Sequence, residues 1–234
     1  MFLWDPRYLI FALPALLLAF YARAKVSSAY KRYSAQPNQR GLTGYDAARV
    51  LLRSAGLEGI GVEEVPGRLS DHYDPGKKVL RLSQGVARSP SVASLGIVAH
   101  EIGHAVQDAT NYGPLRLRSG LVPMVSIGSW LGPIVFIAGY LLSAVTHSTA
   151  IAWLGLFLFA GTVVFALVTL PVEFNASKRA VQLLNTYGLA AGQELQQTKQ
   201  VLDAAALTYV AALAQSLSTL LYYVFLLTGS SRRD

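Results

Sequence analysis

The 234-residue chain contains no cysteine. It therefore has no disulfide framework and no thiolate for a metal, so any metal site must be built from His, Asp or Glu. Charged residues are also scarce, at 14% of the chain compared with about 25% in soluble domains. Hydrophobic residues make up 53%. This balance argues against a soluble domain and indicates a membrane protein.

The longest stretch without Asp, Glu, Lys or Arg is 119–172. One spanning helix needs about 20 apolar residues, so this stretch predicts two spans, 121–145 and 150–172. The apolar runs 8–22 and 204–227 predict two more. For the first run the alternative is a signal peptide, but its positive residues follow it instead of preceding it. For the last run, whose Gln and small residues also suit helix packing in a membrane, the alternative is a buried helix.

The positive residues near the span ends indicate the orientation. On one side of the predicted topology lie Arg23, Lys25, Lys31, Arg32, Arg116, Arg118, Lys178, Arg179 and Lys199, and on the other lie Arg7, Arg232 and Arg233. Positive residues collect on the cytoplasmic side of a membrane protein. We therefore expect a multi-pass protein of the inner cell membrane with both termini outside. The net charge of +7 is then a topology signal, and no nucleic-acid partner is expected.

Two of the four histidines flank a glutamate in the sequence His100-Glu101-Ile102-Gly103-His104. Residues four apart lie on one face of a helix, so both histidines can direct a ring nitrogen at one metal ion. Catalytic zinc takes three protein ligands and leaves a position for water, from which Glu101 can take a proton. The alternative is an amphipathic helix with two incidental histidines, which is less favoured because the chain has so few.

Two residues are candidates for the third ligand. Glu173 follows the second span of the hairpin and, in the predicted topology, returns to the side that holds the motif. We expect it to begin a helix there, and a carboxylate that only complements the helix dipole is the alternative interpretation. His72 precedes the motif on the same side. Catalytic zinc commonly pairs two histidines with one glutamate, which favours Glu173.

The segment before the motif predicts a helix over 44–57 and a small sheet or hairpin. Residues 61–65 and 79–82 read as strands around a Pro75-Gly76 turn. An outer strand of such a sheet can pair with an extended substrate, or it can be an ordinary edge strand. A serine of Ser89-Pro90-Ser91 suits the start of the motif helix.

Several stretches together resemble the YugP-like membrane neutral zinc metallopeptidases. They are 71–75, 100–107, 111–119, 173–180 and 206–212, so the resemblance covers nearly the whole chain. The order of motif helix, hairpin and glutamate helix is also similar to the HtpX and Ste24 membrane proteases. The resemblance implies one Zn²⁺ ion with three ligands: His100, His104 and Glu173.

The same resemblance implies roles for three further residues. Glu101 would be the catalytic base. The oxyanion also needs a donor, for which His72, Tyr73, Tyr209 and Arg179 are all candidates. His72 is favoured because the resemblance keeps it beside the presumed substrate strand. The family pattern implies an Asp where this chain has Asn175. An amide oxygen at that position can still accept a hydrogen bond from the ring of a zinc ligand.

These observations predict a mainly α membrane protein with about four transmembrane helices and a small α+β zincin-like catalytic subdomain, which holds a short sheet and the motif helix. The expected parts are an N-terminal anchor (1–24), a cytoplasmic catalytic part (25–118), a transmembrane hairpin (119–172), cytoplasmic helices with the third ligand (173–203) and a final span with its tail (204–234).

The predicted function is a gluzincin-like zinc metallopeptidase. It would cleave peptide bonds at the cytoplasmic membrane face with a zinc-bound water activated by Glu101. Peptides or proteins are the expected substrates, including membrane proteins in quality control. The alternative is a non-proteolytic zinc-binding scaffold or chaperone, against which the retained Glu101 argues. A transporter is least favoured, because the charges near the spans lie at their ends. The sequence leaves the oligomeric state open.

Overall fold

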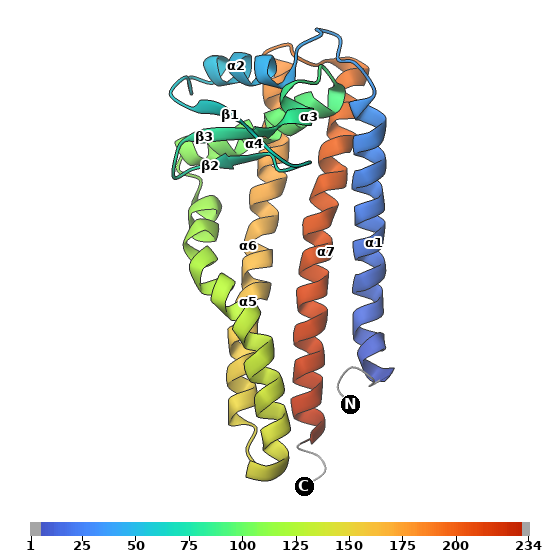
Figure 1. Cartoon of the computed structure of the whole chain (residues 1–234), viewed down its shortest axis with the longest axis vertical. Helices are drawn as coiled ribbons and strands as arrows, with labels where there is room; N and C mark the ends of the chain where they lie inside the picture. Colours follow the sequence, from blue (N-terminus) through green and yellow to red (C-terminus); the bar gives the residue numbers. More distant parts are fainter. Residues whose placement is uncertain (1–5, 231–234) are drawn as a thin grey trace. The chain divides into compact units, whose positions relative to one another are not determined.

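The computed structural model describes residues 6–230 and is mainly helical, with one three-stranded sheet (Figure 1). In chain order the elements are α1 (Pro6–Ser34), α2 (Gly44–Ser54), β1 (Gly61–Val65), β2 (His72–Asp74), β3 (Val79–Ser83), α3 (Gln84–Ala87), α4 (Val92–Ala109), α5 (Gly113–Thr146), α6 (Ala150–Thr186) and α7 (Gly192–Ser230). The prediction of a mainly α protein with a short sheet is confirmed.

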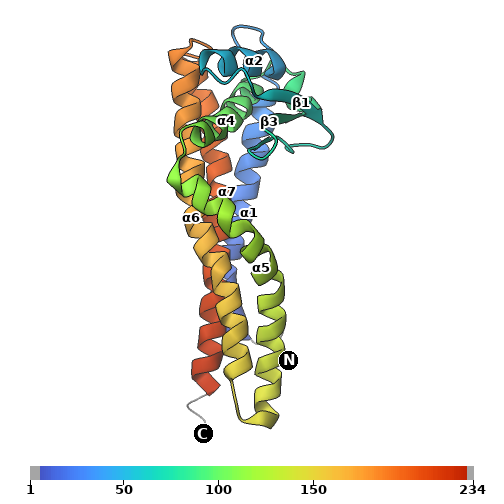
Figure 2. The same ribbon diagram turned by 90° about the vertical axis from the view of Figure 1, so that its left-hand side faces the viewer.

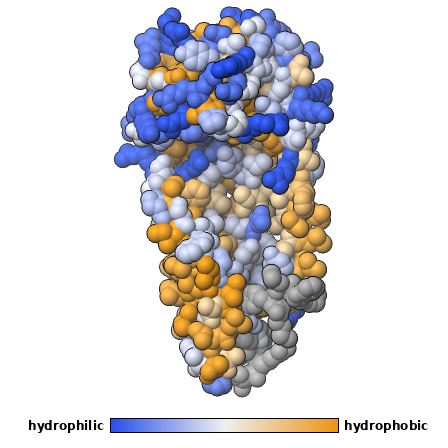
Figure 3. Space-filling view, viewed as in Figure 1, coloured by the Kyte–Doolittle hydropathy of each residue, from blue (hydrophilic) through white to orange (hydrophobic). Residues whose placement is uncertain are grey.

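The chain divides into two compact units. The first comprises the described parts of Met1–Tyr21, Leu117–Leu170 and Thr208–Asp234, and the second comprises Ala22–Arg116 and Pro171–Leu207. Helices α1, α5, α6 and α7 are each long and apolar enough to cross a membrane, in agreement with the four predicted spans. Large apolar side chains such as Trp130 and Phe157 are exposed on the first unit, which carries much of the orange surface in Figure 3. Such a surface suits contact with lipid.

The prediction that Glu173 begins a helix is wrong. Helix α6 runs without a break from Ala150 to Thr186, with Pro171 and Glu173 inside it. A proline removes one backbone hydrogen bond from a helix. Ending the helix there would leave several more backbone groups without partners, and an apolar environment penalises such groups. Glu173 is therefore carried on the same continuous helix as the second span of the hairpin.

Helices α5 and α6 pack through glycines in the first unit. A Cβ atom at Gly155 would lie 2.2 Å from the backbone nitrogen of Phe136, and one at Gly139 would lie 2.3 Å from that of Ala152. Phe136 is fully buried and stacks on Tyr223 of α7 with ring centroids 3.9 Å apart. Small residues let membrane helices approach closely, which builds this core without a large hydrophobic driving force.

The sheet of the second unit has the order β1-β3-β2, with β1 parallel and β2 antiparallel to β3. The strands predicted at 61–65 and 79–82 are confirmed as β1 and β3. Leu80 and Leu82 are fully buried in a core with Leu51 of α2 and Leu95 of α4. Figure 2 shows the sheet beside α4 and below α2. The two edges of the sheet are β1 and β2.

The start of α4 is fixed by a cap. Ser91 is the N-cap, and its hydroxyl accepts a hydrogen bond from the backbone nitrogen of Ser94. One of the two serines offered by the sequence is thus the cap that satisfies an otherwise unpaired N–H group. Helix α2 begins with a capping box between Thr43 and Asp46 and ends at Ser54, three residues before the predicted end.

Substitution of Gly155 tests the packing of the hairpin. We expect Gly155→Ala to lower the melting temperature of the detergent-solubilised protein, because overpacking typically costs about 1–3 kcal/mol. Gly161→Ala is the matched control on the same helix, since nothing lies within 4 Å of the position that its added methyl group would take. The control should melt at or slightly above the parent temperature, because alanine favours helix by about 1 kcal/mol. Equal melting temperatures for the two variants would contradict this packing.

Candidate metal centre

Helix α4 carries the motif and lies very close to α6. A Cβ atom at Gly103 would lie 2.5 Å from the carbonyl oxygen of Ala176 on α6, so the observed approach requires glycine. Ala176 is fully buried at this contact. His104 follows Gly103 directly, and Glu173 lies three residues before Ala176. The glycine inside the motif therefore brings the two histidines and Glu173 together.

The distances from Glu173 to the two histidines match those between the ligand atoms of a zinc site. Oε2 of Glu173 lies 3.2 Å from Nε2 of His100 and 3.5 Å from Nε2 of His104, and one ligand atom from each residue lies within 4.8 Å of the others. Tetrahedral zinc with bonds of about 2.0–2.1 Å holds its ligand atoms about 3.3 Å apart. Among the described residues this is the group of three that can hold a metal ion.

The burial of the group also fits a cation. The side chains of His100 and His104 are 14% and 12% exposed, and that of Glu173 is 2% exposed. Two histidines and one glutamate, poorly exposed and side by side, are a ligand set that suits a divalent cation such as zinc.

Two pKa shifts reflect the same crowding. Burial raises the pKa of Glu101, although the nearby His100 and His104 partly offset this effect. Burial lowers the pKa of His104, but the hydrogen bond that its ring donates to Glu173 and the charges of Glu101 and Glu173 outweigh this effect, so the net shift is upward. The site thus concentrates negative charge in a poorly solvated place.

Each histidine ring is oriented by a neutral side chain. Nδ1 of His100 lies 3.1 Å from Oγ of Ser177, and Nδ1 of His104 lies 3.0 Å from Oε1 of Gln107. Gln107 is fully buried, and its amide nitrogen donates to the carbonyl oxygen of Val172 at 2.8 Å. Because the nitrogen is used as a donor there, Oε1 must accept from Nδ1–H of His104. That assignment leaves Nε2 as the His104 nitrogen that could bind a metal.

The sequence suggested a direct hydrogen bond between Asn175 and a histidine ring. In the structure Asn175 instead bonds Gln107, which in turn bonds His104. Oδ1 of Asn175 accepts from the amide nitrogen of Gln107 at 3.0 Å and from Nε of Arg179 at 2.8 Å. Gln107 and Ser177 were not predicted from the sequence as partners of the histidine rings. Helical spacing could have identified them, because Gln107 follows His104 by three residues and Ser177 follows Glu173 by four, which places each beside a candidate ligand.

Glu101 is held by the edge strand β2. The backbone N–H of Tyr73 donates to its Oε2 at 3.0 Å. The Tyr73 hydroxyl donates to Oδ2 of Asp108 on α4 at 2.7 Å. Burial and the Asp108 carboxylate raise the pKa of Tyr73, so the hydroxyl keeps its proton and remains a donor. Two hydrogen bonds thus fix β2 against the helix that carries the motif.

His72 points to the other face of the sheet. The register pairs His72 with Arg81 and Tyr73 with Leu80, so the two neighbours alternate between the open and the buried face. The His72 ring is exposed, and its Nδ1 lies 2.8 Å from the carbonyl oxygen of Ser70. The structure groups Glu173, and not His72, with the motif histidines. The catalytic role of His72 stays a prediction.

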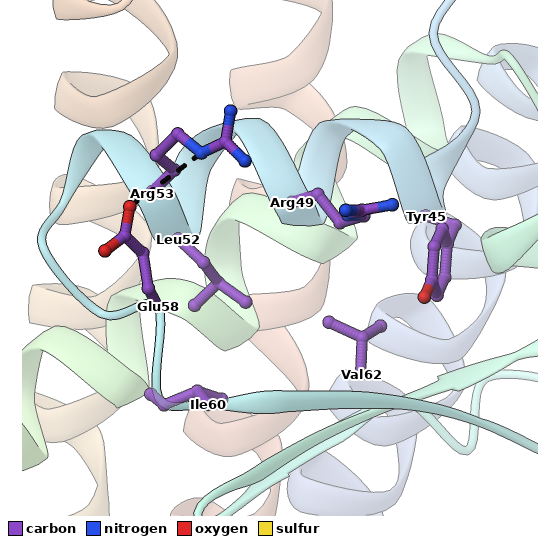
Figure 4. Close-up of a pocket in the computed structure, with 7 residues that line it drawn as sticks. All are labelled: Tyr45, Arg49, Leu52, Arg53, Glu58, Ile60 and Val62. Atoms are coloured by element: carbon purple, nitrogen blue, oxygen red, sulfur yellow. Dashed lines mark ion pairs between the residues drawn. The ribbon is translucent and has the colours of Figure 1, made fainter.

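A cavity of about 360 Å³ lies elsewhere in the second unit, between α2 and β1 (Figure 4). Its walls include Leu52, Ile60 and Val62, with an ion pair of Arg53 and Glu58 at 3.8 Å. Arg53 and Glu58 are largely exposed, so this pair adds little stability. None of the residues of the metal group lines this cavity.

Comparison with known proteins agrees with this geometry. Residues 8–228 match the family described as "Putative neutral zinc metallopeptidase", so the chain belongs to that family of zinc peptidases. The chain is also 41% identical over 219 residues to the "Putative membrane protease YugP" of Bacillus subtilis (strain 168). That match covers 94% of this chain and 96% of the relative. No solved structure matches the chain. The resemblance inferred from the motifs is confirmed.

Gln107→Leu tests the orientation of His104. The leucine keeps the volume but removes the acceptor, so we expect zinc affinity to fall about 10- to 100-fold, the usual effect of losing such a partner. The measurement is competition with a chromogenic chelator. Thr110→Val is the control, because the Thr110 hydroxyl bonds only within its own helix, to Val106 and Gln107 carbonyls. Unchanged affinity in Gln107→Leu would contradict the assigned hydrogen bond.

Gly103→Ala tests the helix contact itself. The added methyl would collide with the Ala176 carbonyl and separate α4 from α6, so both zinc affinity and melting temperature should fall. Gly113→Ala, where nothing lies within 4 Å, should change neither. A Gly103→Ala protein that binds zinc like the parent would show that the separation of the helices does not set the site.

Proposed function

We propose that this chain is a membrane-embedded, zinc-dependent endopeptidase of the gluzincin type. In this proposal His100, His104 and Glu173 hold one zinc ion, and Glu101 is the catalytic base. The observation that carries it is the convergence of three ligand atoms within 4.8 Å beside Glu101. Membership of a zinc metallopeptidase family supports it independently. The catalytic part would combine residues 25–118 with 173–203, because the ligands come from both.

The chemistry divides between the ion and the protein. Zinc, when bound, supplies a Lewis acid that makes water more acidic and polarises the scissile carbonyl. Glu101 accepts the proton of the attacking water and delivers it to the leaving amine nitrogen. Gln107 and Ser177 keep the ligand rings in place throughout.

The edge strand β2 is the proposed binding place for the substrate backbone. The Tyr73 N–H is directed at Glu101 and away from the ladder with β3, because β2 is an edge of the sheet. An extended peptide can add to such an edge through main-chain hydrogen bonds. A peptide placed there would have its carbonyl groups near Glu101, the proposed base for the attacking water. This arrangement favours peptide or protein substrates of varied sequence.

The rival function is a zinc-binding scaffold or chaperone without proteolysis. A structural zinc site has no use for a buried carboxylate beside its ligands. Glu101, held by the Tyr73 backbone, therefore favours the peptidase.

We further propose that the site faces the cytoplasm at the inner membrane, because of the distribution of positive residues. At that location the nearest substrates would be membrane proteins, which the enzyme would cleave in quality control.

Three proteins in detergent test the proposal: the parent, Glu101→Gln and Glu173→Ala. The parent should bind one zinc ion and cleave casein, and chelation should abolish cleavage until zinc is restored. Glu101→Gln should keep zinc and lose at least about 100-fold in activity, as expected for a missing general base. Glu173→Ala should lose zinc. If Glu173→Ala keeps zinc and activity, the ligand set is wrong and His72→Ala becomes the next variant. If Glu101→Gln cleaves like the parent, the proposed mechanism is wrong.

A further inference from the structure

Helix α7 carries a polar side chain at the centre of its apolar segment. Gln215 is the midpoint of the predicted span 204–227. Its side chain is exposed on the surface of the first unit. Within residues 6–230 its carboxamide has no hydrogen-bond partner, and the Thr219 hydroxyl bonds only the Gln215 backbone carbonyl at 3.0 Å. The predicted span therefore places this carboxamide near the middle of the bilayer.

An unpaired carboxamide at this depth is costly. Hydrocarbon offers it no water, and a polar group without a partner there costs several kcal/mol. Eleven or more residues separate Gln215 from either end of the predicted span, which is about 16 Å along a helix. A glutamine side chain is too short to reach the polar headgroups over that distance. The amide must therefore find its partner inside the membrane.

A groove between α1 and α7 surrounds this amide. It encloses a cavity of about 130 Å³, lined on the α1 side by residues that include Ala12 and Ala15. On the α7 side it is lined by Gln215, Ser218 and Thr219. The Ser218 hydroxyl already donates to the carbonyl oxygen of Phe11, which ties α7 to α1. Besides Ser218 and Thr219, the polar side chains of Tyr8 and Gln215 line the groove, and the small Ala12 and Ala15 allow a second helix to approach the Gln215 amide closely.

We propose that a second copy of this chain docks on the α1–α7 groove and pairs its Gln215 amide with that of the first copy. A carboxamide has both donors and an acceptor, so two identical amides satisfy each other. All copies insert with the same orientation, and a two-fold axis along the membrane normal keeps each residue at its own depth. Gln215 is then automatically opposite its counterpart. A foreign helix would need a polar group at the same depth.

The absence of cysteine makes the test direct, because every introduced thiol is unique. Thr219→Cys places a thiol in the groove while keeping Gln215. In native membranes, mild oxidation should link this protein into disulfide dimers. Adding Gln215→Leu should weaken the dimer roughly three- to twentyfold, the range measured for side-chain hydrogen bonds between membrane helices. Gln215→Asn, which keeps the amide, should restore most of the cross-linking.

Leu217→Cys is the matched control, since this residue is exposed on α7 but points about 200° away from Gln215. It should form few dimers. Subunit counting at decreasing protein-to-lipid ratio should show dimers for the parent and monomers for Gln215→Leu. Equal cross-linking of the two cysteine variants, or parent monomers in pure lipid, would overturn the proposal. Dimers that are insensitive to Gln215→Leu would also overturn it. None of these readouts depends on peptidase activity, so they are independent of the proposed function.

Discussion

The close contact between α4 and α6 at Gly103 is the constraint on which the metal centre depends. The Ala176 carbonyl occupies the place where any side chain at position 103 would lie. That separation places Glu173 within 3.5 Å of both histidine rings. It also places Ser177 beside His100. Ligands and orienting groups therefore come from one helix crossing, and a change in its spacing disturbs all of them together.

The groups that orient the ligands are neutral. A carboxylate bonded to Nδ1 pushes negative charge into a histidine ring and raises its basicity, whereas an amide or a hydroxyl does so much less. Gln107 and Ser177 therefore leave the histidines weaker electron donors than carboxylates would. We expect the bound ion to remain a stronger Lewis acid as a result. In the proposed site, the buried Glu173 would contribute most of the negative charge around the ion.

The sequence predicts the parts of this protein that depend on local pattern. Apolar run lengths predict the spans, and helical spacing predicts the paired histidines. The structure differs from these predictions where the role of a residue depends on contacts between elements that are distant in the sequence. Gln107 looks like any polar helix residue until α6 packs beside it. His72 looks equivalent to Tyr73 until the register of β2 turns its ring to the open face. Pro171 suggests a helix end, yet α6 continues through it because unpaired backbone groups are costly in an apolar environment.

The order of the ligands along the chain has a consequence for biosynthesis. His100 and Glu173 are 73 residues apart, and the apolar hairpin of α5 and α6 lies between them. During synthesis the two histidines leave the ribosome well before the glutamate, so the early chain can hold a metal only weakly. The complete set exists only after the second hairpin helix has been made. With the proposed ligand set, a peptidase built in this order would lack a complete metal site until its hairpin has been synthesised.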